Sequence, residues 1–190
     1  ALLEPSGVLT SYFYQDTIYL DTSGGTDNGD VVFSLVSDIY GPIHLVDGKR
    51  VEEDISVGLY TLTAIKDGSL NYLDVSFSID INVNPISQEP FSISNLIDQY
   101  DYLRDIYFDV SGGSSDGDVS FTIPGESLEG NLLRGGPDVG GYTVTAIKGG
   151  SLNYFDISAT FDFRINQISQ DSNFQFITVT TQYDYLRDIS

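Results

Sequence analysis

The chain repeats itself, and this internal repeat limits its possible folds more than any other feature of the sequence. Residues 12–35 align without gaps with residues 100–123, and residues 60–88 align without gaps with residues 142–170. In the second pair of segments, 18 of 29 positions are identical. The motif QYDYLRDI, which opens the second copy, returns near the end of the chain. The period of about 83 to 88 residues is the size of one small β-sandwich.

These repeats predict the domain organisation. We expect repeat 1 over residues 1–89, repeat 2 over residues 90–172, and the opening strand of a third, incomplete repeat over residues 173–190. The chain is therefore expected to be a segment of a longer array. Between the aligned blocks each repeat has a variable patch, residues 36–59 and 124–141, whose lengths differ. Surface loops tolerate such length differences, so we expect loops or sheet edges there.

Apolar and polar residues alternate near the end of each repeat. Repeat 1 places apolar residues on one face of a predicted strand at Val75, Phe77, Ile79, Ile81 and Val83, with Asp74, Ser76, Ser78, Asp80 and Asn82 on the other face. Repeat 2 does the same with Ile157, Ala159, Phe161, Phe163 and Ile165. A period of two with one apolar face is typical of an antiparallel sheet that is solvated on one side.

The remaining apolar runs predict further strands. They lie at residues 18–20 and 106–110, 31–35 and 119–123, and 59–66 and 142–148. In the turn that follows the last pair, Gly68 and Gly150 are expected to take a positive φ. Asn71 and Asn153 are expected to bond to their own backbone there. Six or seven short strands per repeat, separated by turns, predict an all-β sandwich.

The blocks GLYTLTAIKDGSLNYLDVSFSIDI and GGYTVTAIKGGSLNYFDISATFDF resemble the bacterial immunoglobulin-like tandem repeats of giant surface adhesins. The upstream pattern SGG-x-x-x-G-x-V-x-F, at Ser23–Phe33 and Ser111–Phe121, is also similar to that family. The resemblance covers nearly the whole chain. It implies tandem immunoglobulin-like β-sandwich domains, antiparallel and of about seven strands each. It also implies a stalk or adhesive array in an extracellular or cell-surface protein.

Charge and composition restrict the partners. The formal net charge is −20, which repels nucleic acid and anionic membranes. No apolar run approaches the roughly 18 residues of a membrane span, so membrane insertion is not expected. Because the sequence has no cysteine, disulfides and thiolate metal sites are excluded. The expected partners are neighbouring repeats of the array, other copies of the chain, or a surface ligand.

The sequence offers little for catalysis. Its one histidine, His44, lies in the variable patch of repeat 1 and has no counterpart in repeat 2. Nucleophilic catalysis needs a base beside the nucleophile, and no paired Ser/His arrangement is present. Pairs of carboxylates are inevitable among 28 acidic residues, so they do not indicate a glycosidase. We therefore expect a protein that is not an enzyme and requires no cofactor.

Calcium is the one ligand with candidate residues. Carboxylates gather around the SGG turns and around the QYDYLRD motif, and such hard oxygen ligands suit Ca²⁺. The candidates are Asp21, Asp27 and Asp30, then Asp109, Asp116 and Asp118, and finally Asp98, Asp101 and Asp105. The alternative is that Asp is present because it favours turns. In the QYDYLRD motif, Arg104 could pair with the acids instead.

Besides an accessory role for the repeats as domains that trail a hydrolase, three functions remain open. The leading one is a structural or adhesive module that acts as a stalk or spacer in a quasi-one-dimensional array. The second is recognition of a glycan or protein ligand through the variable patches. The third concerns the apolar residues Phe174, Phe176, Ile177 and Val179. They either close the sheet of repeat 2 or enter a neighbouring molecule by strand addition, which would build fibres.

Aromatic residues are frequent near the start of each repeat. Tyr12, Tyr14, Tyr100 and Tyr102 occupy equivalent positions. Sugar stacking is one use of such rings. Because the sequence has no tryptophan, we expect these tyrosines to pack in the cores and at the junction of the repeats instead.

Overall fold

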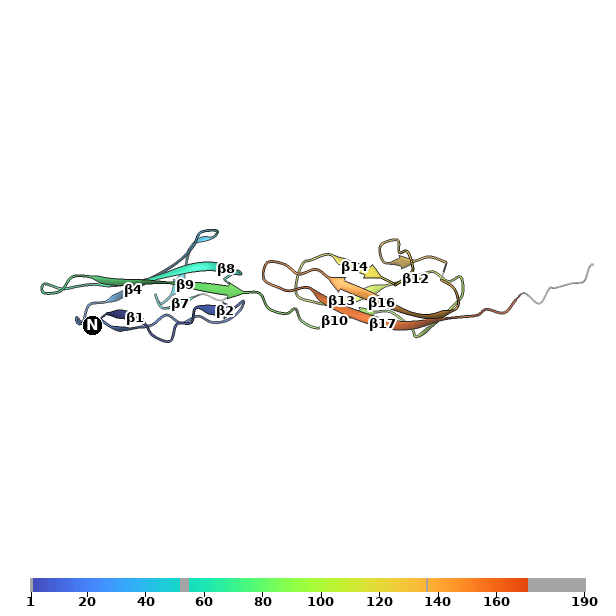
Figure 1. The fold of residues 1–190 in the computed structure, drawn as a ribbon, viewed down its shortest axis with the longest axis horizontal. Helices are drawn as coiled ribbons and strands as arrows, with labels where there is room; N and C mark the ends of the chain where they lie inside the picture. Colours follow the sequence, from blue (N-terminus) through green and yellow to red (C-terminus); the bar gives the residue numbers. More distant parts are fainter. Residues whose placement is uncertain (1, 52–54, 136, 171–190) are drawn as a thin grey trace, which may run out of the picture.

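The structure, a computed structural model, describes residues 2–51, 55–135 and 137–170. Within these ranges it contains strands and turns but no helix, which confirms the all-β prediction. Consequently no helix in the described ranges is long and apolar enough to cross a membrane. Figure 1 shows two units lying end to end along the long axis of the molecule. The predicted opening strand at 173–190 lies outside the described residues.

The described part of repeat 1 contains the first nine strands. They are β1 (Leu3–Pro5), β2 (Ser11–Phe13), β3 (Thr22–Gly24), β4 (Val31–Ser37), β5 (Gly41–Ile43), β6 (Leu45–Val46), β7 (Arg50–Val51), β8 (Gly58–Lys66) and β9 (Val75–Asn84). Repeat 2 contains the other eight. They are β10 (Phe91–Ser94), β11 (Gln99–Asp101), β12 (Ile106–Tyr107), β13 (Asp109–Gly112), β14 (Val119–Thr122), β15 (Leu132–Leu133), β16 (Gly140–Lys148) and β17 (Ile157–Asn166).

Each repeat is a two-layer sandwich. The main sheet has the order β2-β9-β8-β4-β5 in repeat 1 and β11-β17-β16-β14 in repeat 2. The facing layer is made of the pairs β1-β3 and β6-β7 in repeat 1, and of β10-β13 and β12-β15 in repeat 2. Neighbouring strands are antiparallel, except that β2 runs parallel to β9 and β11 runs parallel to β17. This two-sheet arrangement is an immunoglobulin-like fold.

The two repeats have separate hydrophobic cores, as the duplicated apolar pattern requires. The alternating strand β9 has Ile81 and Val83 buried, while all its polar residues from Ser76 to Asn82 are exposed. Strand β17 follows the same pattern, with Phe163 and Ile165 buried. The predicted alternation is therefore confirmed in both repeats. The facing layer completes the first core with Ile18, Leu20 and Val51, and the second with Ile106 and Phe108.

A tyrosine locks the start of the long central strand of each repeat, β8 and β16, and it is buried in repeat 1 (Tyr60) and partly buried in repeat 2 (Tyr142). The Tyr60 hydroxyl donates to the Ser56 carbonyl at 2.6 Å, and the Tyr142 hydroxyl donates to the Asp138 carbonyl at 2.7 Å. This is the tyrosine corner of immunoglobulin-like sandwiches, in which the phenol bonds to backbone a few residues upstream. Burial raises the pKa of Tyr60 and of Tyr142, so both phenols stay protonated donors.

Two local predictions were wrong. Residues 18–20 form a single bridge, Tyr19 to Arg50, instead of a continuous strand. Gly68 and Gly150 do not have a positive φ. The glycines of the SGG turns have it instead. Glycine is needed at these two positions because of close approach. A Cβ at Gly68 would lie 2.1 Å from the Tyr72 carbonyl oxygen, and one at Gly150 would lie 2.3 Å from that of Tyr154.

Candidate functional site

The candidate site is the joint between the repeats, where the linker after β9 pairs with a turn of repeat 2. Ile86 forms a parallel bridge with Tyr154. The Ile86 N–H donates to the Asn153 carbonyl at 3.1 Å, and the Phe155 N–H donates to the Ile86 carbonyl at 2.9 Å. The linker therefore leaves the main sheet of repeat 1 and joins repeat 2 through a single parallel bridge.

The side chain of Gln88 enters a polar slot in repeat 2 and is only 7% exposed. Its amide nitrogen donates to the carbonyl oxygens of Phe155 at 2.8 Å and Gly149 at 3.2 Å. Its amide oxygen accepts from the Ser115 N–H at 3.2 Å and the Ser115 hydroxyl at 3.0 Å. Donors and acceptors of the carboxamide are thus both satisfied, as burial of a polar group requires. Such a fully bonded buried group fixes one geometry of the joint.

Repeat 1 also touches this turn with residues outside the linker. The Asn153 side-chain oxygen accepts from the Val57 N–H at 2.9 Å. The Tyr154 ring packs edge-on against Tyr14 with 5.5 Å between centroids, and its hydroxyl accepts from the Gln15 side-chain amide at 3.4 Å. The turn is therefore held from several segments of repeat 1, and these contacts oppose bending about the linker.

Some of these residues were expected at the joint and others were missed. Core and junction packing was predicted for the four tyrosines together and is confirmed, because Tyr14 packs at the joint and Tyr12, Tyr100 and Tyr102 pack in the cores. Asn153 was predicted to bond to its own backbone, which is wrong, because its side chain bonds to repeat 1. Gln88 and Ser115 were not identified. The available signal was the sequence ISQ, which ends both aligned blocks at 86–88 and 168–170.

The calcium candidates near the SGG turns mostly bond to backbone. Asp21 accepts from the Thr22 N–H, Asp27 from the Asn28 N–H and Asp109 from the Val110 N–H. The backbone carbonyls of Asp30 and Asp118 accept hydrogen bonds from the N–H groups of Asp67 and Gly149, in the turn after the central strand. Asp116 is exposed. These bonds are the ones that aspartate makes in turns.

The candidates in the QYDYLRD motif do not converge either. Asp98 and Asp101 accept backbone hydrogen bonds through their carbonyls, and the Asp105 carboxylate accepts from the Gly135 N–H at 2.7 Å. Within the described ranges, no three Asp, Glu, His or Cys side chains form a group that could hold a metal ion. Calcium binding thus stays a prediction. The Asp105 carboxylate forms an ion pair with Arg134 at 3.8 Å, and not with Arg104, which was the alternative to calcium in this motif.

Comparison with known proteins adds little beyond this geometry. No protein-family model and no curated protein matches the chain. Solved structures with a similar arrangement include the fibronectin(III)-like modules of Clostridium thermocellum CbhA, at 11% identity and a TM-score of 0.34, covering 87% of this chain and 95% of that one. Human protocadherin-24 EC1-2 is similar at 11% identity and a TM-score of 0.34, covering 90% and 100%.

The N-terminal four Ig domains of Dscam1 isoform 8.4 are similar at 13% identity and a TM-score of 0.39. That match covers 88% of this chain but 46% of the Dscam1 chain. Similarities of this size identify neither a family nor a function. The assignment of an immunoglobulin-like fold therefore rests on the strand topology of the chain itself.

Proposed function

We propose that this chain is a structural module of a secreted or surface-displayed protein, in which immunoglobulin-like repeats set reach and stiffness, and that it is not an enzyme. The observation that carries the proposal is the insertion of Gln88 into repeat 2 (7% exposed). A linker that only tethered two domains would be flexible and solvated. This linker has hydrogen bonds to the next repeat at Ile86 and at Gln88.

The distribution of charge and of reactive groups supports a non-catalytic role. His44, the one histidine of the sequence, is exposed between β5 and β6. The net charge of −20 suits a protein that stays soluble and separate from other polyanions. The resemblance of the repeats to bacterial adhesin arrays agrees with a place outside the cell. We therefore propose neighbouring repeats, not a substrate, as the partners.

Rotational diffusion of the whole chain tests the proposal. We expect NMR relaxation to give one anisotropic tumbling tensor for both repeats, and small-angle scattering to give an elongated particle. Gln88→Ala removes the carboxamide from the joint and should give the two repeats different tumbling rates. The matched control is Gln170→Ala, because Gln170 ends the second ISQ sequence and is exposed. Independent tumbling of the repeats in the unsubstituted chain would refute a spacer role.

A further inference from the structure

The outer end of repeat 1 has the same turn that repeat 2 uses at the joint. Residues 67–74 align with residues 149–156 and have the same backbone bonds. The Ser69 N–H donates to the Tyr72 carbonyl at 2.8 Å, as the Ser151 N–H donates to that of Tyr154 at 3.0 Å. The Gly68 N–H donates to the Asp74 carboxylate at 2.8 Å, which reproduces the bond from Gly150 to Asp156. The outer end of repeat 1 is therefore built as the receiving half of a joint.

Residues of this turn that lie at the linker in repeat 2 are more exposed to solvent in repeat 1. Leu73 is 94% exposed, whereas its counterpart Phe155 is 54% exposed. Leu70 is 99% exposed, against 55% for Leu152. The Leu73 N–H has no hydrogen bond within the described part of the chain, while the Phe155 N–H donates to the linker. The edge that pairs with Ile86 in repeat 2 is thus unpaired in repeat 1.

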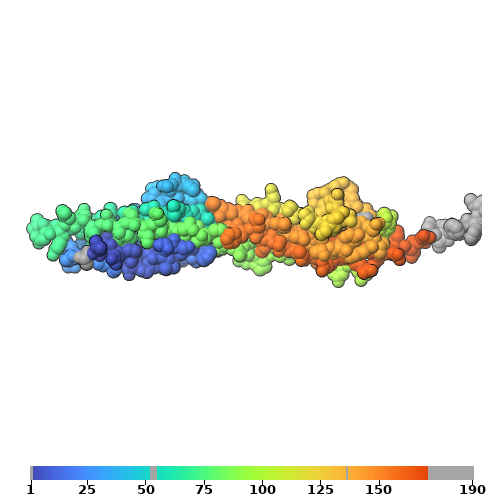
Figure 2. All heavy atoms as spheres, viewed as in Figure 1, coloured from blue at the N-terminus to red at the C-terminus, as the bar shows by residue number. Residues whose placement is uncertain are grey.

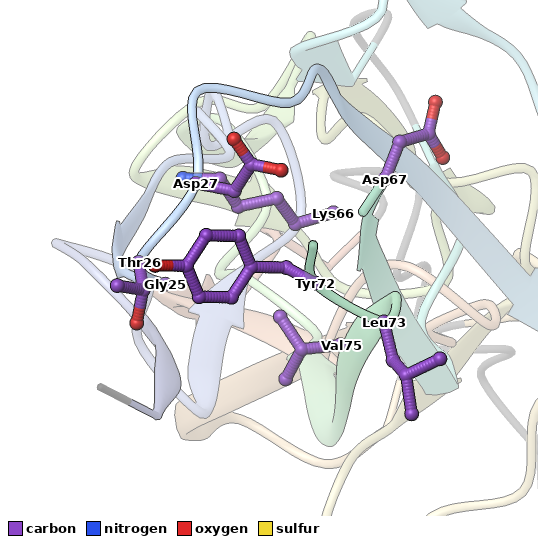
Figure 3. Close-up of a pocket in the computed structure, with 8 residues that line it drawn as sticks. All are labelled: Gly25, Thr26, Asp27, Lys66, Asp67, Tyr72, Leu73 and Val75. Atoms are coloured by element: carbon purple, nitrogen blue, oxygen red, sulfur yellow. The ribbon is translucent and has the colours of Figure 1, made fainter. Parts of the chain in front are cut away.

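Beside this edge lies a cavity of about 120 Å³, which Figure 3 shows with its lining. Its walls are formed by Gly25, Thr26, Asp27, Lys66, Asp67, Tyr72, Leu73 and Val75. The equivalent residues of repeat 2 include Gly149, Phe155 and Ser115, which bind the Gln88 side chain. The cavity of repeat 1 is therefore the Gln88 slot without an occupant.

Two substitutions give this cavity a different chemistry from the slot in repeat 2. Asp27 replaces Ser115, and Asp67 replaces Gly149, while Lys66 and Lys148 are equivalent. The Lys66 ammonium donates to the Gly24 carbonyl at 3.3 Å. The Asp27 carboxylate lies beside this cation, whose charge helps to lower the pKa of Asp27, whereas the Asp67 carboxylate points away from the cavity (Figure 3). The opposite change, Asn28 for Asp116, lies at an exposed position outside the cavity lining.

The carboxylate of Asp27 is the group that decides which side chain can enter. The Ser115 hydroxyl lies 3.0 Å from the Gln88 amide oxygen and 2.6 Å from the Gly149 carbonyl and can donate its one proton to either, whereas the Asp27 side chain at the same position only accepts. One oxygen of Asp27 accepts from the Asn28 N–H, and the other, Oδ2, is buried without a hydrogen-bond partner among the described residues. A glutamine would bring its amide oxygen against Oδ2, whereas a side chain with donors alone would satisfy it.

We infer that the cavity at the outer end of repeat 1 receives the linker strand of another immunoglobulin-like repeat that carries lysine or arginine where the present linker carries Gln88. The inference rests on the proposed function, because it assumes that repeats join end to end. The strand pairs with residues 71–73 as Ile86 pairs with Tyr154. The cationic side chain donates to Asp27 and to the carbonyls of Asp67 and Leu73.

The register of β1 allows a direct test on the full chain. Leu3 pairs with Gly24 as Phe91 pairs with Gly112, so a residue placed directly before Ala1 takes the position of Gln88. We would add Asn-Pro-Ile-Ser-X before Ala1, with X as lysine, arginine, glutamine or alanine. We expect lysine and arginine to slow amide exchange of Leu73 at least tenfold relative to alanine and glutamine, and to raise the melting temperature of repeat 1.

Asp27→Ser in the same extended chains provides the matched control, since serine is the residue that repeat 2 has at this position. We expect this substitution to reverse the order, so that glutamine protects Leu73 more than lysine does. Equal protection by lysine and alanine, or a preference for glutamine with Asp27 in place, overturns the inference. The Phe155 amide, measured in the same samples, keeps the two proposals apart. If Phe155 is protected and Leu73 is not, only the inference fails, and if neither is protected the spacer role fails with it.

Discussion

At the scale of single residues, equivalent positions of the two repeats differ in what they can bind. Ser115 donates to a buried carboxamide, while Asp27 at the same position has a buried oxygen with no hydrogen-bond partner among the described residues. The pKa of the Asp27 carboxyl is lowered, first by the nearby Ser69 side chain and then by the Asn28 N–H.

This lowered pKa predicts an acid dependence for repeat 1. Because the folded-state pKa lies below the ordinary value of 3.8, the stabilisation is fully present above that value. It is lost as the pH falls through the folded-state pKa. We therefore expect the native chain to lose unfolding free energy relative to Asp27→Asn as the pH falls from 7 to 3. Denaturant unfolding measures it, with Ser115→Ala as a control that removes no ionisable group. A difference that is constant with pH would contradict the prediction.

The tyrosine corners predict a matched pair of stability losses. Tyr60→Phe removes the bond to the Ser56 carbonyl and should cost repeat 1 about 1 kcal/mol. Tyr142→Phe should do the same in repeat 2 through the Asp138 carbonyl. Because burial raises both pKa values, this stabilisation is present below the ordinary value of 10.0 and lost as the pH rises through the folded-state pKa. Thermal unfolding at pH 7 and pH 11 checks both parts, and unchanged melting of either repeat at pH 7 would count against the corner.

At the scale of elements, the turn after the central strand lies at residues 67–74 in repeat 1 and 149–156 in repeat 2. It connects two strands in both repeats, and in repeat 2 it also binds the linker. The close approach of backbone to Gly68 and to Gly150 allows no Cβ in either turn. We expect Gly68→Ala and Gly150→Ala each to destabilise their own repeat by roughly 1–3 kcal/mol. Only Gly150→Ala should also release the linker, since residues 153–155 bind Ile86.

Amide exchange at Phe155 and the tumbling rates of the two repeats measure this difference. Gly68→Ala serves as the control, because its turn lies at the outer end of repeat 1. Equal effects of the two substitutions on the joint would show that the turn of repeat 2 does not hold the linker.

The sequence predicted those elements whose pattern is local and periodic. Alternation from Val75 to Val83 requires a strand with one buried face, and the structure has it as β9. The role of Gln88 depends on a partner more than sixty positions away in Phe155, and no local periodicity indicates that contact. The conformation of Gly68 was misjudged because close approach and positive φ both select glycine, and the sequence does not separate them.

At the scale of the whole molecule, negative charge dominates an extended body. Figure 2 shows the two repeats as one narrow particle along the long axis. The chain has a net charge of −20, and within the described ranges the ion pairs are those of Arg134 with Asp105 and Glu129, so most described carboxylates form no ion pair. Such repulsion destabilises a compact state, and salt screens it.

Because of this negative charge, any salt is expected to stabilise the chain, so a test of calcium binding needs a control for screening. We expect sodium chloride to raise the melting temperature of both repeats by screening alone. If the predicted aspartates bind Ca²⁺, millimolar calcium should raise it further than magnesium at the same concentration, because binding to the folded state alone stabilises it. Differential scanning calorimetry with calcium, magnesium or a chelator makes the comparison. Equal shifts with the two divalent ions would retire the calcium sites.

The parallel pairs β2-β9 and β11-β17 join the first part of each repeat to its last strand. When the two ends of the molecule are drawn apart, the paired strands are pulled in opposite directions along their own lengths. The hydrogen bonds between them lie across the pull and bear the load together, instead of opening one after another. Tension on the chain is thus resisted in shear, and it passes from β9 to the next repeat through a linker that is hydrogen-bonded to that repeat at Ile86 and Gln88.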